Sequence, residues 1–408
     1  MKLLKQYLND IKNTYTVDEK LIVLVFTSLF LPWWFSIGVI CACGLFVFLK
    51  SDYKALIQDV KGGKILMLLS IYLVVVSILN ANWYGLAISI ALILMFILVL
   101  HYRKHINPKV FSLILDAAIV LSLISVVYAV FEQFYYMSQI EGMGFLDIQN
   151  KPEYRVHTFF FNANYYALVI LFIECMCIYK FFVNDNLKAR VYYTLAGVAN
   201  LFAMFLTGGR IAWLGLAVGV ITMVFINRWW KMLAAVLAAG AGAVGVLALK
   251  PGLIPRLASK GFKIERRRQI WQTAWLIIKD HGLLGGGPLA YYNLYNGYKD
   301  LYIETYGLKS FKQYKLGITA PHSHTIFFEP FVSFGLVGTL LLLGYLWTQM
   351  KGAINLITQK IDYSLAAFIF GCGMVTLSFC ILDFPILWHQ TGFLLFLLIG
   401  SYEMYKGE

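Results

Sequence analysis

The sequence predicts an all-α, polytopic membrane protein of about twelve transmembrane helices, with one large outward-facing loop that contains an amphipathic helix. Of the 408 residues, 60% are hydrophobic and only 13% are charged, whereas roughly a quarter of the residues of a soluble domain are charged. Apolar runs recur from Leu21 almost to the C-terminus, with no polar domain between them. Lysine and arginine are distributed unevenly between the segments that join these runs. These three observations together define the fold class.

The apolar runs predict the individual spans. A span needs roughly 17–25 mainly apolar residues, and the first two candidates are short and divided by Pro32, so one kinked span is an alternative there. We expect nine spans within residues 1–249, a large extracytoplasmic loop at residues 250–322, and three spans within residues 323–408. The twelve candidates are residues 20–31, 35–49, 64–79, 83–100, 110–137, 164–183, 190–206, 210–226, 230–249, 323–347, 363–381 and 390–405.

The positive charges orient the chain. If the N-terminus is cytoplasmic, nineteen Lys and Arg residues fall in inside segments and three in the short outside connections, as the positive-inside rule expects. Losing one span at Pro32 would put the positive segments outside, so the charges favour twelve spans. Both termini are therefore expected inside. Residues 1–19 lack a small-residue cleavage site, so we expect no signal-peptide removal.

All six cysteines lie within apolar runs, where free thiols pack as small hydrophobes. We expect neither a disulfide framework nor a cysteine metal site. The residues are Cys41, Cys43, Cys175, Cys177, Cys372 and Cys380.

The predicted loop is strongly basic. From Lys250 to Pro321 it carries twelve Lys and Arg against four acidic residues, and long loops are translocated largely regardless of charge. A basic concavity beside the outer leaflet would suit a phosphate or pyrophosphate group on a lipid; a solvated loop that touches anionic headgroups is the alternative. Apolar residues at helical spacing predict an amphipathic helix over 265–279. The glycines and proline of 283–288 predict the turn that ends this helix.

Four arginines are candidates for anion binding. Arg210 follows a Thr-Gly-Gly turn at the predicted outer surface, where an arginine is either functional or a snorkelling anchor. Arg266, Arg267 and Arg268 open the amphipathic helix, and guanidinium forks bind phosphate oxygens in a bidentate manner. Three successive residues cannot all point one way on a helix, so we expect one or two of them to act.

His322 and His324 stand where the loop enters the tenth predicted span. Imidazole is well suited to proton transfer near neutral pH. A metal site is the alternative, but no nearby acid or cysteine in the sequence completes one. Tyrosines after the turn, Tyr291 and Tyr292 among them, are suited to stacking on sugar rings or to anchoring at the membrane interface. No phosphate-binding loop, Asp-x-Asp pair or His-Glu-x-x-His motif occurs, so we expect no ATP-driven activity.

Three motifs follow one another around this loop. The first is Leu-Thr-Gly-Gly-Arg at 206–210. The second is Arg-Arg-Gln-Ile-Trp at 267–271, followed by Asp-His-Gly-Leu-Leu-Gly-Gly-Gly at 280–287. In the third, His324 is followed by Gly335 and Gly338.

Together these motifs resemble the O-antigen ligase and O-antigen polymerase superfamily, of the Wzy_C type. That family shows, in the same order, a Thr-Gly-Ser-Arg turn, an Arg-x-x-x-Trp helix with an Asp-x-Pro-Leu-Leu-Gly-x-Gly turn, and a His-Asn signature followed by spaced glycines. Glu329 stands at the family's Gln/Glu position. Two residues depart from the pattern: Thr325 replaces the usual Asn and Gly282 replaces the usual Pro.

The resemblance implies a cofactor-free and metal-independent membrane glycosyltransferase of surface polysaccharide biosynthesis, at the outer face of the bacterial cytoplasmic membrane. Its donor would be a glycan on polyprenyl (undecaprenyl) pyrophosphate. Its acceptor would be a second carrier-linked glycan for a polymerase, or a lipid, wall polymer or protein for a ligase. Besides membrane lipids, no further partner and no nucleic acid is expected.

The resemblance also implies residue roles. His324 would be the catalytic base, and Arg210 and Arg267 would stabilise the pyrophosphate. Substrate-binding roles would fall to Arg266, Arg268, His322, Tyr291 and Tyr292. The alternative function is a transporter or flippase of lipid-linked glycan, in which Glu174, an acidic residue well inside a span, would couple transport to protons.

Overall fold

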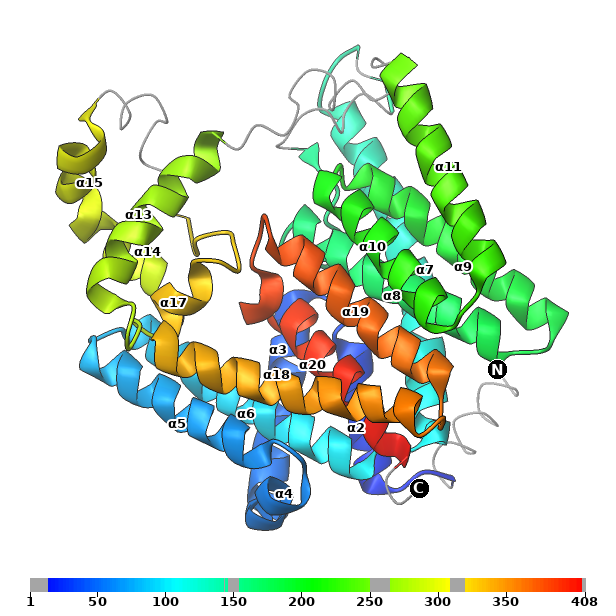
Figure 1. The fold of residues 1–408 in the computed structure, drawn as a ribbon, viewed down its shortest axis with the longest axis horizontal. Helices are drawn as coiled ribbons and strands as arrows, with labels where there is room; N and C mark the ends of the chain where they lie inside the picture. The colour runs from blue at the N-terminus through cyan, green and yellow to red at the C-terminus, as the bar shows by residue number, and fades with distance from the viewer. Residues whose placement is uncertain (1–13, 143, 146–153, 250–264, 309–319, 406–408) are drawn as a thin grey trace.

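The structure is a computed structural model that describes residues 14–142, 144–145, 154–249, 265–308 and 320–405 (Figure 1). All regular secondary structure in these residues is helical, and none of them lies in a strand. The predicted all-α class is therefore confirmed.

A helix lies at or near each of the first nine predicted spans. The bounds are α2 (Val17–Ser28), α3 (Trp33–Lys50), α5 (Gly63–Leu79), α6 (Trp83–His105), α7 (Pro108–Ser138), α8 (Ala163–Val183), α9 (Leu187–Leu206), α10 (Arg210–Ile226) and α11 (Trp230–Leu249). Pro32 separates α2 from α3 as two distinct helices. A short helix that was not predicted, α4 (Tyr53–Asp59), precedes α5 and is capped by the side chain of Asp52.

The C-terminal third departs from the predicted boundaries. Residues 323–347 do not form one helix: an irregular segment leads into α17 (Glu329–Ser333), and α18 (Gly335–Thr358) begins only after it. Pro330 has no amide donor and Gly335 has a φ of 62°, so a continuous helix is interrupted there. The predicted start of the tenth span is therefore wrong, and both candidate histidines lie in a loop.

The remaining segments complete the bundle. Helix α19 (Tyr363–Cys380) is followed by a turn η5 (Pro385–Leu387). The twelfth predicted span is divided into a π-helical turn η6 (His389–Phe393), α20 (Leu394–Ile399) and a 3-10 segment η7 (Gly400–Tyr405).

Six of the described helices are long and apolar enough to cross a membrane, or seven if the bent pair α4 and α5 counts as one span. The chain is thus a multi-pass membrane protein, and the number twelve remains a prediction. All six cysteines are free, and all except Cys41 are buried.

Helix α8 lies at the centre of the molecule, and 78% of its apolar stretch of 18 residues is buried. It packs against α7, α9, α10 and α19, and α10 lies along α19. A neighbouring group contains α3, α5, α6 and α18 (Figure 1). The loop that holds His322 and His324 leads directly into α17, which packs against α18 and α13.

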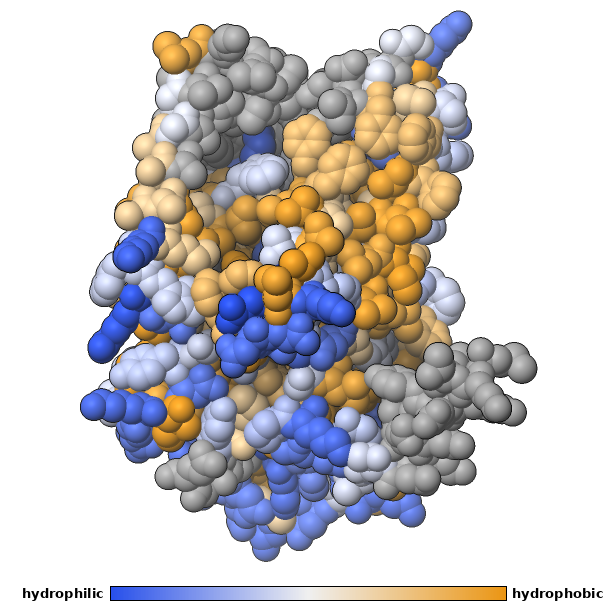
Figure 2. Space-filling view, turned by 90° about the vertical axis from the view of Figure 1, so that its right-hand side faces the viewer, coloured by the Kyte–Doolittle hydropathy of each residue, from blue (hydrophilic) through white to orange (hydrophobic). Residues whose placement is uncertain are grey.

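Hydrophobic side chains cover the middle of one face of the molecule, and hydrophilic side chains gather at its lower end (Figure 2). Large apolar side chains of the outer helices are exposed, for example Leu195 at 63% and Leu237 at 52%. An exposed apolar surface of this kind is what a membrane-embedded protein presents to lipid.

The described part of the large loop folds into a small helical unit on one side of the bundle (Figure 1). Its elements are α13 (Glu265–His281), α14 (Ala290–Leu294), η4 (Tyr295–Tyr298) and α15 (Lys299–Tyr306). The predicted amphipathic helix and the turn after it are both confirmed. Ala274 and Ile277 of α13 are buried against Tyr291 and Val332, whereas Trp275 is 49% exposed.

Candidate functional site

Two of the sequence motifs are joined through their backbones. Gly286 and Gly287 donate amide hydrogen bonds to the carbonyls of Val332 and Ser333, each at 2.9 Å. Gly285 and Gly335 adopt positive φ angles of 72° and 62°, and a Cβ at either position would collide with the backbone of the other segment. Glycine is therefore required at both crossings. This pairing fixes the turn after α13 against the start of α18, close to the histidine loop.

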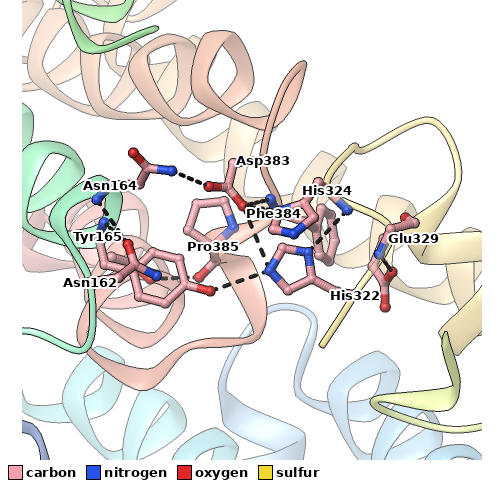
Figure 3. Close-up of polar contacts among 11 residues, drawn as sticks. Asn162, Asn164, Tyr165, His322, His324, Glu329, Asp383, Phe384 and Pro385 are labelled. Atoms are coloured by element: carbon pink, nitrogen blue, oxygen red, sulfur yellow. Dashed lines mark hydrogen bonds and ion pairs between the residues drawn. The ribbon is translucent and has the colours of Figure 1, made fainter. Parts of the chain in front are cut away.

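His324 forms a pair with a buried aspartate (Figure 3). Its Nδ1 lies 3.1 Å from Oδ1 of Asp383, in the segment after α19. The other carboxylate oxygen of Asp383 accepts a hydrogen bond of 2.8 Å from the side-chain amide of Asn164. Burial alone would raise the pKa of Asp383, but the hydrogen bond from His324, the two histidine charges and Asn164 hold it well below its usual range. Asp383 is thus a carboxylate at physiological pH.

An ionised carboxylate beside Nδ1 assigns the imidazole proton to that nitrogen. Nε2 of His324 is then the hydrogen-bond acceptor and carries the basic lone pair. The side chain of His324 is 26% exposed, whereas Asp383 is only 3% exposed. His324 also has a φ of 54°, an uncommon conformation for a non-glycine residue and one that clusters at functional sites. The imidazole of His324 is therefore oriented by Asp383 and accessible at Nε2, which is the geometry that a general base requires.

His322 occupies a different position. It is 4% exposed, and its Nδ1 accepts a hydrogen bond from the backbone amide of His324 at 3.1 Å. Its Nε2 lies 3.6 Å from Asp383 and 3.4 Å from the hydroxyl of Tyr165 (Figure 3). Burial, with smaller contributions from the charges of His324 and Arg267, lowers the pKa of His322 to about 3 against the opposing effect of Asp383. His322 is therefore a neutral residue that orients the loop.

Glu329 fixes the same loop from the other side. One carboxylate oxygen accepts a 2.6 Å hydrogen bond from the amide of Ser323, and the other accepts a 2.6 Å bond from the hydroxyl of Ser333. Glu329 is fully buried, and burial raises its pKa despite these bonds. It thereby links the histidine loop to α17.

His322, His324 and Asp383 each offer a metal-ligand atom, and these atoms lie within 4.8 Å of one another. The expectation that no acid completes a site with the two histidines is therefore wrong, because the fold brings in Asp383 from 59 residues further along the chain. All three side chains also have hydrogen-bond partners within the protein.

The structure brings two of the predicted arginines close to this pair. Burial lowers the pKa of Arg267, the charge of Asp383 opposes this shift, and the charge of Arg210 adds to it, so the three charged groups influence one another. Arg210 is the first residue of α10, directly after Gly209. Arg268 is exposed to solvent. Arg266 belongs to α13, but its side chain lies outside the described part of the structure.

A further arginine, Arg155, was not singled out from the sequence. Its guanidinium donates to the carbonyl of Thr207 at 2.7 Å and to the side-chain oxygen of Asn164 at 2.8 Å. Because Asn164 contacts Asp383, Arg155 connects the turn before Arg210 to the carboxylate. The sequence Asn162-Ala-Asn164 could have indicated a polar site at the start of α8. Asn162 caps this helix by accepting hydrogen bonds from the backbone amides of residues 164 and 165.

The two predicted tyrosines differ. Tyr291 is fully buried, with its ring 5.6 Å from that of Tyr295, so it offers no free face to a sugar in this conformation. Tyr292 is 44% exposed and presents its ring at the surface of the loop unit.

An apolar cavity of about 330 Å³ adjoins the site. His322 and Tyr165 form part of its wall, beside Pro288 and Trp388. The remaining lining is mostly apolar and comes largely from α3 and α6, including Ile37, Ile40, Ile88 and Met95.

The fold and the site together define a multi-pass helical membrane protein with a histidine–aspartate pair beside arginines. Residues 195–343 match the O-antigen ligase family model. The resemblance seen in the motifs is thereby confirmed, and the matched region contains Arg210, Arg267 and His324 but not Asp383. No curated protein matches the chain. The family match implies a glycosyltransferase-type enzyme of surface polysaccharide biosynthesis.

Proposed function

We propose that the protein transfers a glycan from a polyprenyl pyrophosphate carrier to an acceptor hydroxyl at the outer face of the bacterial cytoplasmic membrane. The observation that carries this proposal is the 3.1 Å contact between His324 and the buried carboxylate of Asp383, with Arg210 and Arg267 beside it. A base and an anion-binding pair are the two functions that such a transfer needs.

In the proposed step, the acceptor oxygen forms a bond to the anomeric carbon while the bond from that carbon to the pyrophosphate oxygen breaks. The acceptor proton passes to Nε2 of His324, and the electron pair of the broken bond leaves with the pyrophosphate. Asp383 holds the imidazole in the required tautomer and stabilises the imidazolium that forms.

Arg210 and Arg267 would stabilise the negative charge that develops on the leaving pyrophosphate. Preorganised cationic donors in a partly buried site are effective for this purpose, and guanidinium groups can bind phosphate oxygens in pairs. Arg266, Arg268 and Tyr292 are proposed to contact the glycan or the carrier phosphates at the edge of the site. The energy of the pyrophosphate link makes a nucleotide unnecessary, and the proposed transfer requires no metal.

The apolar cavity beside His322 is suited to the first isoprene units of the carrier. Its lining carries few polar groups, and burial of a hydrocarbon chain there would be favourable by roughly 25 cal/mol per Å². A carrier with its chain in this cavity would hold its pyrophosphate near the arginines.

The proposed topology has twelve spans, both termini in the cytoplasm and the α13–α15 unit outside. The nineteen-to-three distribution of positive charges supports it. Single cysteines at Gly297, which is exposed, and at Lys109, at the start of α7, test it in a cysteine-free background. An impermeant thiol reagent should label only Gly297→Cys in intact cells, and labelling of Lys109→Cys alone would invert the assignment.

A specific observation favours the alternative of a transporter or flippase. One carboxylate oxygen of Glu174, inside α8, has no hydrogen-bond partner, and Glu174 lines a cavity of about 350 Å³ that also contacts α9. Proton coupling would require a carboxyl in such a position.

Purified protein in detergent decides between these functions, because no compartment exists there. Incubated with a polyprenyl-pyrophosphate glycan and an acceptor, it should release polyprenyl pyrophosphate and form the glycosylated product, also in the presence of a chelator. Glycan translocation in proteoliposomes without any transfer in detergent would instead establish the transporter. Activity that is lost on chelation and restored by Zn²⁺ in an Asp18→Asn/His105→Gln variant, in which the other described cluster is removed, would assign His322, His324 and Asp383 to a metal.

The acceptor class can be determined from gene deletion. Surface glycans reduced to single repeat units would indicate a polymerase. Full-length chains that remain on the carrier would indicate a ligase.

A further inference from the structure

A second histidine–aspartate cluster lies at the C-terminal end of α6. The N-terminal end of this helix contacts the turn after α13. His101 and His105 are four residues apart on α6 and therefore lie on one face of the helix. Asp18, in the first turn of α2, faces both. Its carboxylate oxygens lie 3.5 Å from Nε2 of His101 and 3.9 Å from Nδ1 of His105.

His101 is the unusual member of this cluster. It is 2% exposed, yet neither ring nitrogen makes a hydrogen bond in the described structure. Leaving a buried polar group without a hydrogen bond costs roughly 1–3 kcal/mol, so each such group requires an explanation, of which a bound ion is one. Glu19, next to Asp18, is already engaged with the side-chain amide of Asn107 at 2.6 Å.

We propose that Asp18, His101 and His105 bind a divalent transition-metal ion of the Zn²⁺ type. Two imidazoles and a carboxylate are ligands that Zn²⁺ commonly takes. Ligand atoms that share a tetrahedral ion at bond lengths of about 2.0–2.1 Å lie roughly 3.3 Å apart. The three ligand atoms here already lie within 4.8 Å of one another, and Oδ1 of Asp18 is 3.5 Å from Nε2 of His101, so only small side-chain movements are needed.

Two positive side chains next to His101 on α6 already have partners outside the cluster. Lys104 lies 3.1 Å from the carboxylate of Asp59. The guanidinium of Arg103 donates to the carbonyl of Lys61 at 2.7 Å and to the carboxylate of Glu403 at 2.5 Å. Both cations are therefore directed towards oxygen atoms outside the cluster.

The ion would tie α2 to α6 at a distance from the proposed chemistry. Asn82, at the start of α6, donates to the carbonyl of Gly286 in the turn that follows α13. His101 lies nineteen positions after Asn82 along the helix, which is roughly 28 Å at 1.5 Å per residue. The metal would thus have a structural role, distinct from glycan transfer.

Metal binding by the purified full-length protein tests the proposal. The His322→Gln/His324→Gln background removes the other cluster that offers three ligands. After chelator treatment, this background should bind one equivalent of Co²⁺ with the visible absorption of a low-symmetry site, and Zn²⁺ should displace it and raise the melting temperature.

In the same background, His101→Gln, His105→Gln and Asp18→Asn should each weaken binding by about tenfold or more and abolish the thermal shift. The matched control is His281→Gln, a half-buried histidine outside the cluster, which should bind as the background does. If substitution of buried His101 prevents folding, His105→Gln decides, because its side chain is 33% exposed. Unchanged affinity in His105→Gln and Asp18→Asn, or no binding in the background, would overturn the proposal.

Discussion

Among the residues that the structure describes, two histidines and an aspartate come together twice, and the two clusters differ in how their nitrogen atoms are satisfied. In the cluster around His324, the aspartate is held by Asn164 and the rings are hydrogen-bonded. In the cluster around His101, the aspartate is 46% exposed on its side chain and the buried ring makes no hydrogen bond. The same three residue types therefore form the proposed base and its partners in one place and a candidate ligand set in the other.

The difference shows that residue type and proximity do not define a site's chemistry on their own. An anchored carboxylate fixes the proton on one nitrogen of its histidine and leaves the other free to accept a proton. A buried ring without such a partner gains most from an ion. The following substitutions test whether hydrogen bonding separates the two clusters in this way.

The largest expected effect comes from removing the charge of the anchored carboxylate. Asp383→Asn keeps the shape of the side chain. Its amide can either accept a hydrogen bond from Nδ1 of His324 or donate one to it, so the tautomer of His324 is no longer fixed. We expect transfer by purified protein to fall about a hundred-fold or more. Donor binding should persist, because the arginines remain.

Asp18→Asn is the matched control for this substitution, since it removes the aspartate of the other cluster. Its transfer rate should stay near that of the wild type when both proteins are folded. An equal loss in both variants would show that the carboxylates act only through stability.

Arginine substitutions should have the next largest effect. Arg210→Lys and Arg267→Lys keep the positive charge but lose the planar fork, so we expect about a ten- to hundred-fold loss of transfer with normal membrane insertion. The exposed Arg268 serves as the control, and Arg268→Lys should lose far less. Wild-type rates in both of the first two variants would exclude pyrophosphate binding by these guanidinium groups.

A smaller effect is expected at His322. Its Nδ1 accepts one backbone hydrogen bond, and the oxygen of a glutamine is able to replace this acceptor. His322→Gln should therefore lose less than about tenfold, which is below the roughly hundred-fold loss expected at the least for a general base. Transfer rates of His322→Gln and His324→Gln measured side by side provide the check, and a larger loss at His322 would reverse the two roles.

The smallest effect is expected at Glu329. In Glu329→Gln, the amide oxygen can accept from Ser323 and the amide nitrogen can donate to the Ser333 hydroxyl, so both links to the loop survive. We expect transfer within about fivefold of the wild type, since one altered hydrogen bond is worth about 1 kcal/mol. Glu329→Ala, which loses both links, should lower the melting temperature and serves as the contrast.

Much of the helical framework follows from the sequence, because continuous apolar runs and a strong local period leave little choice of structure. The helix from Glu265 was predicted for this reason. The tenth span was misplaced because Ile326, Phe327 and Phe328 read as its first apolar residues. These residues actually lie before Pro330 and Gly335, where the helix is interrupted. The interruption arises because residues 332–335 pack against the glycine turn after α13, a contact that local composition does not reveal.

The site was predicted only as far as its motifs are local. His324, Arg210 and Arg267 could be selected from short patterns, and the structure brings them together near Asp383. Asp383 itself lies between two apolar runs, 59 residues from His324, and only the packing of α19 beside α8 brings it to Asn164. An acidic residue directly before a Phe-Pro turn in an apolar segment was the available signal.

The most direct test of the proposed chemistry is single-turnover glycan transfer by purified His324→Gln, with carrier-linked donor binding measured on the same preparation. The wild type and His281→Gln are the references. If Asp383 orients His324 as the base, transfer should fall by about a hundred- to ten-thousand-fold while donor affinity stays within a few fold of the wild type. A loss of transfer below about tenfold, with binding intact, would contradict the central claim and assign the proton transfer to another group.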